Sequence, residues 1–220
     1  PVFVSAASAK RAFRLSRKLR QFDVIVNVPK LKTHCLVGMT CAVKNMFGCI
    51  PGKLKTGHHL AQPDPMEFSE MLLALHDTVT PDLTIVDAVL GMEGPGPGAG
   101  DPRLFGLVVA GRSSIAVDAV CARVLGFADK EVSTVWLAQK RGISEAALGD
   151  IEVRGEQIAE VAIANLKKPR VSVTTRVPAL LMNLGKTLFT PGPAVLPGRC
   201  LLCEDCMRIC SAGAVTMTTR

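Results

Sequence analysis

Four cysteines crowd into eleven residues near the end of the chain, and their thiols are the clearest candidates for chemistry in this sequence. Soft thiolates at such close spacing can converge on irons that lie only a few ångströms apart, as they do in the bacterial ferredoxin run. The usual paired zinc site separates its two cysteine pairs by a longer loop, so the spacing favours a [4Fe–4S] cluster over a structural zinc knuckle. The expected ligands are Cys200, Cys203, Cys206 and Cys210.

The sequence around the last of these cysteines leaves the cluster count open. Ser211 follows Cys210 where the usual run has proline, but residues 212–215 still resemble the strand that follows in ferredoxins. In two-cluster ferredoxins the fourth cysteine of a run binds the other cluster, and a second run supplies the missing thiolate. No second run precedes Arg220. Either the natural chain continues into one, or Cys210 closes a single cluster.

Basic and amide side chains form a second candidate site, because they come after the first expected strand at residues 23–28. In open α/β sheets, ligands collect beyond the carboxyl ends of the strands. Ammonium, imidazole and amide groups there suit a carboxylate or phosphate, and the alternative is a solvated basic face. The expected substrate-binding residues are Lys30, Lys32, His34, Lys44, Asn45 and Lys53.

Two carboxylates are candidates for general-base or metal chemistry beside these lysines. Asp87 ends the second expected strand, and Asp118 lies on the helix after the third. In a parallel sheet both are expected to face the same crevice, although a charge role near the helix N-terminus is the alternative for Asp118. No catalytic role is assigned, and the candidates are His34, Lys44, Asp87 and Asp118.

Other side chains carry weaker signals. His58 and His59 are adjacent in an expected loop and are either metal ligands or ordinary loop residues. The remaining cysteines are expected to be buried apolar side chains, which is the usual place of a free cysteine. They are Cys35, Cys41, Cys49 and Cys121.

Apolar strands alternate with amphipathic helices along most of the chain, which predicts an α/β fold with a mostly parallel sheet layered with helices. A glycine- and proline-rich loop at 91–100 is expected to roof the basic site. Strands are expected at 23–28, 83–89, 105–110 and 151–154, helices at 11–22, 38–47, 66–78, 115–125 and 132–142, and a loop at 52–65.

The amino-acid composition changes at residue 167, after which prolines and glycines become frequent. We therefore expect three parts. They are an α/β domain at 1–166, a linker at 167–198 with a short helix at 179–189, and a ferredoxin-like iron–sulfur segment at 199–220.

Composition narrows the class of protein. The chain has 220 residues, of which 48% are apolar, so a packed core is expected and disorder is excluded. No apolar run is long enough to span a membrane. Residues 1–60 carry eleven Lys or Arg against one acid, which points to an anionic partner near this end. Clustered cysteines and no visible signal peptide indicate a reducing, cytoplasmic location.

The chain resembles a bacterial and archaeal family of uncharacterised iron–sulfur proteins, domain of unknown function family 362. The resemblance implies the α/β architecture and a ferredoxin-type tail, but it carries no assigned reaction. Members usually begin upstream of the first strand and often end with two cluster runs, which implies truncation at both ends. The motifs that carry it are PKLKTH at 29–34, MTCAVKNMFG at 39–48, IPGKLKTGHH at 50–59, TIVDAVLGMEGPGPGAG at 84–100 and AVDAVCARVLG at 116–126.

Two functional hypotheses follow, and whether the chain is an enzyme stays open between them. In the first, the iron–sulfur segment feeds electrons to an anionic substrate or cofactor held by the lysines and His34. In the second, the chain is a non-enzymatic electron carrier or maturation partner that docks an acidic redox protein through residues 10–20. Nucleic-acid binding is poorly supported, because only 4% of the residues are aromatic and base stacking needs such rings.

Overall fold

The computed structural model divides the chain into two compact units, residues 1–175 and residues 176–220, which we describe separately. The residues that the structure describes are 2–5, 12–52, 54–169, 198 and 200–209. The expected helix at 179–189 and the expected strand at 212–215 lie outside them.

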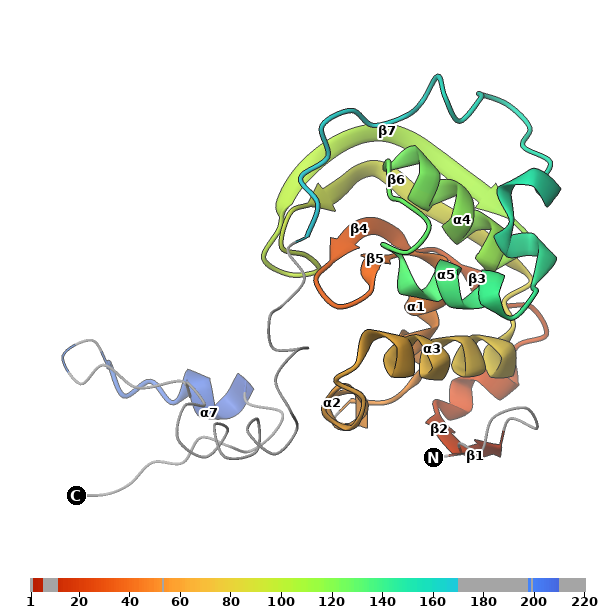
Figure 1. The fold of residues 1–220 in the computed structure, drawn as a ribbon. Helices are drawn as coiled ribbons and strands as arrows, with labels where there is room; N and C mark the ends of the chain where they lie inside the picture. Colours follow the sequence, from red (N-terminus) through yellow and green to blue (C-terminus); the bar gives the residue numbers. More distant parts are fainter. Residues whose placement is uncertain (1, 6–11, 53, 170–197, 199, 210–220) are drawn as a thin grey trace. The chain divides into compact units, whose positions relative to one another are not determined.

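A five-stranded sheet forms the centre of the first unit (Figure 1). Strand β6 pairs with β7 along one edge and with β3 and then β4 along the other, and β5 pairs with β4. Strands β3, β4 and β6 are parallel, whereas β5 and β7 run the other way, so the expected α/β fold with a mostly parallel sheet is confirmed. The strands are β3 Val26–Asn27, β4 Lys30–His34, β5 Gly38–Thr40, β6 Leu83–Glu93 and β7 Asp101–Gly111.

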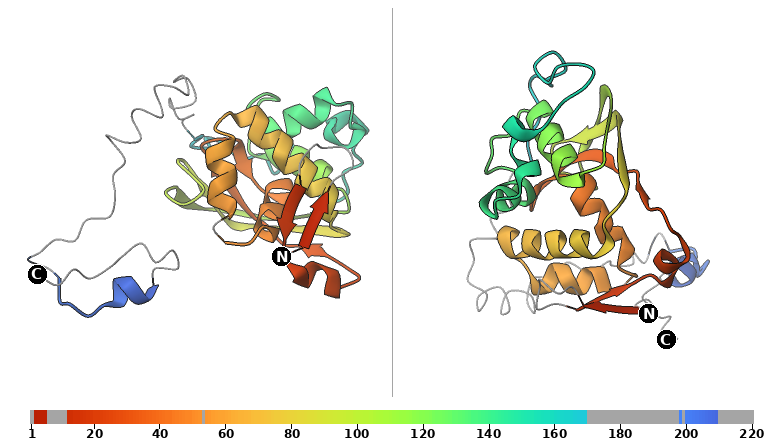
Figure 2. Two further views of the ribbon diagram at one scale, coloured as in Figure 1. Left: turned by 90° about the horizontal axis from the view of Figure 1, so that it is seen from below. Right: turned by 90° about the vertical axis from the view of Figure 1, so that its right-hand side faces the viewer.

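Helices α3, α4 and α5 lie on one side of β6 and β7 (Figure 2). Val86 and Ala88 of β6 are fully buried and pack with Val117 and Cys121 of α4, while Val89 and Val108 on the strands are exposed. The helices are α1 Ala42–Asn45, α2 Leu54–Ala61, α3 Pro65–Val79, α4 Ser114–Val124 and α5 Ser133–Lys140, with 3-10 helices η1 Arg17–Gln21, η2 Met46–Cys49, η3 Ser144–Ala146 and η4 Leu148–Asp150.

Helix α3 is the centre of a second apolar cluster and confirms the helix expected at 66–78. The Asp64 carboxylate caps its first turn by accepting the Met66 and Glu67 N–H groups, and Thr80 ends it in a left-handed conformation. The apolar side chains on its inner face are fully buried. They are Phe68, Met71, Leu72 and Leu75.

Several expected elements are wrong. The helix expected at 11–22 is instead strand β2, Ala12–Leu15, paired with β1, Val2–Ser5, and followed by η1. Phe13 and Leu15 are both buried two residues apart, which is the spacing of a strand. The loop expected at 52–65 contains helix α2, the helix expected at 38–47 begins with strand β5, and residues 151–154 form no strand.

The glycine-rich turn between β6 and β7 lies against the end of β4. The Cys35 N–H donates to the Gly96 carbonyl at 3.1 Å, and the Thr33 hydroxyl donates to the Gly94 carbonyl at 2.8 Å. A Cβ atom on Gly96 would lie 2.1 Å from the Thr33 carbonyl oxygen, so only glycine permits this approach. The turn is therefore held beside Thr33 and Cys35, the two chain neighbours of His34. The loop was expected to begin at Gly91, but β6 continues as far as Glu93.

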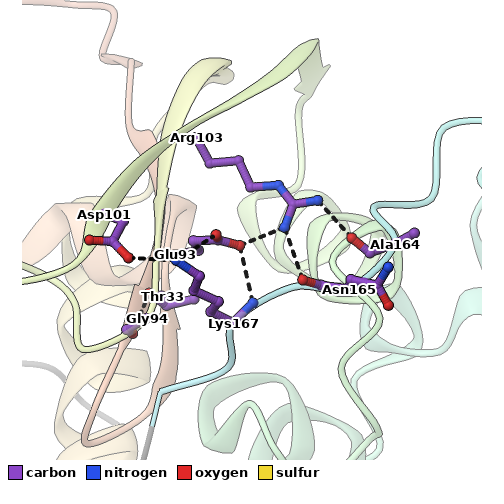
Figure 3. A network of polar contacts seen from close by, with 8 residues as sticks. All are labelled: Thr33, Glu93, Gly94, Asp101, Arg103, Ala164, Asn165 and Lys167. Carbon is purple, nitrogen blue, oxygen red and sulfur yellow. Dashed lines mark hydrogen bonds and ion pairs between the residues drawn. The ribbon is translucent and has the colours of Figure 1, made fainter.

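A polar network fixes the segment that crosses the end of this hairpin (Figure 3). The Arg103 guanidinium contacts the buried Glu93 carboxylate at 2.6 Å and donates to the Ala164 and Asn165 carbonyls. The Lys167 N–H donates to the same carboxylate, and its ammonium pairs with Asp101 at 2.9 Å. The network joins the chain after residue 163 to the two longest strands.

Candidate functional site

Lys44 lies on α1, a helix of only four residues whose position depends on hydrogen bonds from outside it. The buried Asp118 carboxylate accepts the Ala42 N–H at 2.7 Å and the Val43 N–H at 3.1 Å. The Asn27 amide donates to the Ala42 carbonyl at 3.0 Å. Because these bonds come from α4 and β3, the core of the domain determines where Lys44 is placed.

His34 ends strand β4 and is buried. Its Nδ1 accepts the N–H groups of Leu36 at 3.1 Å and Val37 at 3.4 Å, so the proton of the neutral ring is on Nε2. Burial, then the charges of Lys44 and His59, together lower the pKa of His34 to about 3. His34 is therefore a neutral imidazole at physiological pH.

The Lys44 ammonium is half-buried beside two aromatic rings. Its Nζ lies 5.5 Å from the centre of the Phe47 ring and 5.8 Å from that of Phe68. Burial, then the charge of Lys55, lower the pKa of Lys44 to about 8, and Cys35 partly opposes this lowering. None of the ion pairs in the described part of the chain involves Lys44.

Helix α2 brings two further basic side chains to the same place. His59 stacks on Phe68 with 4.5 Å between ring centres and meets Phe47 edge-on at 5.2 Å. Burial, then Lys44, then His58 lower the pKa of His59. Lys55 and His59 are four residues apart and so lie on one face of the helix. We call His34, Lys44, Lys55 and His59 the Lys44 cluster.

The structure separates Lys30 from this cluster, which corrects the expectation that the lysines converge. The Lys30 ammonium pairs with Asp87 at 2.6 Å and donates to the Leu90 carbonyl at 2.9 Å. Lys30 and His34 are four residues apart along one strand, which corresponds to roughly 13 Å. Lys32 lies between them, opposite Thr40 of β5 and Met92 of β6. Lys53 lies outside the described residues.

The two carboxylates do not face one crevice as expected. Asp87 alternates along β6 with Val86 and Ala88, which face α4, so it lies on the opposite face of the sheet from Asp118. The Lys30 hydrogen bond, followed by the Val89 N–H, lowers the pKa of Asp87. Asp118 is neither exposed nor at the helix N-terminus, and it acts instead as an acceptor for the start of α1.

Asn45 is also held in a structural network. Its side-chain amide donates to the side-chain Oδ1 of Asn27 at 2.8 Å, and the Asn27 side-chain amide donates to the Thr84 hydroxyl at 3.3 Å. The expectation for the scattered cysteines holds for Cys41 and Cys121, which are buried, while Cys35 and Cys49 are half-buried.

Sequence analysis missed Lys55 and the two phenylalanines, and it treated His59 only as a metal ligand or a loop residue. The signal was present in the spacing of Lys55 and His59, but it was readable only if residues 54–61 were recognised as a helix. Gly52 and Gly57 made that segment read as a loop.

The second unit carries the ferredoxin-like cysteines. The thiols of Cys200, Cys203 and Cys206 are free and exposed, and Cys206 lies in the short helix α7, Asp205–Ile209. Cys210 lies outside the described residues. Leu202 and Glu204 have left-handed φ values of 54° and 60°. Such residues curve the backbone on both sides of Cys203.

The described residues gather no three His, Cys, Asp or Glu side chains in an arrangement able to hold a metal ion. Within the same residues, no helix is long and apolar enough to cross a membrane.

Comparisons with known proteins identify one family and one curated relative. The family model described as "Domain of unknown function (DUF362)" matches residues 2–123. The thylakoid-associated protein sll1697 of Synechocystis sp. is 36% identical over 159 residues, which are 72% of this chain and 49% of that protein. The chain thus spans about half the length of the relative. No solved structure matches.

Proposed function

This chain belongs to the DUF362 family of domains of unknown function, and from that premise we propose that it is an iron–sulfur redox protein that holds an anionic substrate or cofactor in the Lys44 cluster. Because the chain spans about half of its curated relative, the activity of the whole protein is part of this proposal.

The observation that carries the anion site is a half-buried ammonium without a carboxylate partner among the described residues. Lys44 has Lys55 and His59 as neighbours, so the local charge is positive and uncompensated. A partly desolvated cation is costly unless it is paired. A bound carboxylate or phosphate would remove this cost and would gain charge-assisted hydrogen bonds.

The cysteine segment is proposed to hold a [4Fe–4S] cluster through Cys200, Cys203, Cys206 and Cys210. When bound, such a cluster supplies one-electron transfer. The residues of the first unit act on the ligand instead. Lys44 and Lys55 bind its negative charge, and the Phe47 and Phe68 rings exclude water from one side of the amine. The donor set and the left-handed residues beside Cys203 support the assignment of the cluster.

Anaerobically purified full-length chain is expected to contain iron and inorganic sulfide. Its broad absorbance near about 400 nm should bleach with dithionite, as expected for thiolate-bound clusters. Cys203→Ser should lose the cluster because it removes a central ligand, whereas Cys121→Ser, which removes a buried thiol of the first unit, should keep it. Iron and sulfide analysis with electron paramagnetic resonance measures both. Stoichiometric zinc without sulfide would contradict the cluster.

Lys44→Met is expected to weaken the binding of inorganic phosphate or succinate by about 1.5–3 kcal/mol, the range for hydrogen bonds to a charged group. Lys18→Met, which removes an exposed charge on η1, is the matched control and should leave this binding unchanged. Isothermal titration calorimetry at fixed ionic strength measures both affinities. Equal losses in the two variants would show that only the net charge of the chain attracts the anion.

A non-enzymatic electron carrier is the second candidate function, and η1 favours it. Arg17, Lys18 and Arg20 are exposed on this helix, whose first turn holds no acid. Such a surface would speed the encounter with an acidic redox protein, and the rate would fall with salt. Salt-sensitive docking that depends on Lys18 while Lys44→Met binds phosphate normally would favour this carrier over the anion site.

We propose a cytoplasmic location for the chain. The relative is named as thylakoid-associated, so association with a membrane is the alternative. Fractionation of cells that make the full protein distinguishes the two.

A further inference from the structure

We propose that Lys44 forms a Schiff base with the carbonyl carbon of an oxo-acid, a ligand that carries both a carbonyl group and a carboxylate. This inference rests on the anion site proposed above and names the chemistry of the ligand held there.

The surroundings of the amine differ from those of a structural lysine. The Nζ atom lies within 6 Å of two ring centres, and the described residues offer it no carboxylate partner. Lys30 and Lys167 each pair with an aspartate, and Lys130 and Lys140, which also lie over a ring, are exposed. Lysines that react as nucleophiles lie in a desolvated site or next to another cation, and Lys44 has both features.

Within the part of the chain that the structure describes, the titratable groups that interact with Lys44 are basic side chains and one thiol. Lys55 and His59 approach from α2, His34 from the end of β4, and Cys35 from the residue after it. With the pKa of Lys44 lowered to about 8, about a tenth of the amines are neutral at pH 7. An ordinary lysine has fewer than about one neutral amine in a thousand at that pH.

The reaction conserves atoms and oxidation state. The lone pair of the neutral amine forms a C–N bond to the carbonyl carbon, the C=O π bond breaks, and a proton moves from nitrogen to oxygen. Loss of water from this carbinolamine then forms the C=N bond. The protons move through solvent water, because His34 uses Nδ1 to accept two backbone N–H groups and carries its proton on Nε2. Addition of water reverses the reaction, so no oxidant or reductant is needed.

The second cation of the cluster explains why the ligand carries a carboxylate. Once Lys44 is used as a neutral nucleophile, Lys55 remains to pair with a negative group. A simple ketone would leave Lys55 without a partner, whereas an oxo-acid satisfies both side chains. Phe47 and Phe68 flank the amine and favour the imine by keeping water away from it.

Borohydride trapping tests the proposal in the full chain. The chain is incubated at pH 7.5 with pyruvate or with acetone and then reduced with sodium borohydride, which makes an imine permanent. Peptide mass mapping is expected to find the reduced pyruvate adduct on Lys44 at more than about ten times the level on exposed lysines such as Lys18. Acetone, which lacks the carboxylate, should label Lys44 much less.

Lys44→Arg is the matched variant, because a guanidinium keeps the charge but is not deprotonated and cannot add to a carbonyl. It should bind inorganic phosphate within about threefold of the unmodified chain yet form no pyruvate adduct. Phosphate binding without any adduct in the unmodified chain, or adducts spread evenly over exposed lysines, would overturn the Schiff base and leave the anion site standing. A Lys44 adduct in a chain that binds no phosphate would instead contradict the anion site alone.

Discussion

Replacing His34 by Asn is expected to make the protein more resistant to acid than the unmodified chain. The His34 pKa is about 3 in the folded state and about 6.5 in the unfolded state. Between these values the unfolded state binds the extra proton, so the free energy of unfolding falls as the pH falls below 6.5. Each pH unit costs about 1.4 kcal/mol, so the chain should lose about 2 kcal/mol between pH 7 and pH 5 that His34→Asn does not lose.

Asn is chosen because its side-chain oxygen takes the place of Nδ1. It can accept the Leu36 and Val37 N–H groups, so the turn after β4 keeps its acceptor while the titratable ring is removed. His34→Ala removes both and should cost stability at every pH. Urea unfolding of the three proteins at pH 5, 6 and 7 separates these effects. A His34→Asn chain as acid-sensitive as the unmodified one would show that His34 is protonated in the fold.

The elements that could be predicted from sequence are those whose apolar pattern decides between helix and strand. Helix α3 has a capping aspartate, a proline in its first turn and an unbroken inner face, so several independent signals agree. The segment at 11–22 shows the opposite case. Its apolar residues fit either period, and pairing with β1 decides for the strand. Partners distant in sequence cannot be deduced from local spacing.

The candidate site could be predicted only in part, because it also depends on where the strands end and which elements they meet. His34 and Lys44 were both predicted, and in the structure the charge of Lys44 acts on the buried His34 ring. Lys30 was wrongly grouped with them, because the chain continues after Pro29 as strand β4, which carries Lys30 and His34 at its opposite ends. Sequence analysis placed the end of the strand at residue 28 and expected the lysines to converge beyond it.

The buried acid Asp118 makes the stability change with pH in the opposite direction to His34. The pKa of Asp118 is raised to about 6 because burial outweighs the opposing effect of the Ala42 and Val43 N–H groups and of the Cys41 thiol. The folded state therefore holds the proton more tightly than the unfolded state, whose pKa is about 3.8. This contribution to stability is full below about pH 4 and is lost as the pH rises through 6. Between pH 4 and pH 6 the effects of His34 and Asp118 on the free energy of unfolding change in opposite directions and partly cancel in the unmodified chain. Variants of one residue at a time are therefore needed to measure either effect.

Asp118→Asn is expected to remove the part of the pH dependence of stability that Asp118 causes. The unmodified chain should lose about 2 kcal/mol from this group as the pH rises from 4 to 7, and the variant should not. The variant also has a constant penalty of about 1–3 kcal/mol, because different carboxylate oxygens accept the two N–H groups and the amide places an NH2 group against one of them. The informative quantity is therefore the change with pH in the stability difference between the two chains, measured by urea unfolding at pH 4.5, 5.5 and 7.

Asp150→Asn, at an exposed residue of η4, serves as the control, and its stability difference from the unmodified chain should not change with pH. If the Asp118→Asn difference is equally constant, the carboxylate is charged throughout this range, and α1, which carries Lys44, is held by an ion rather than by a group that titrates near neutral pH.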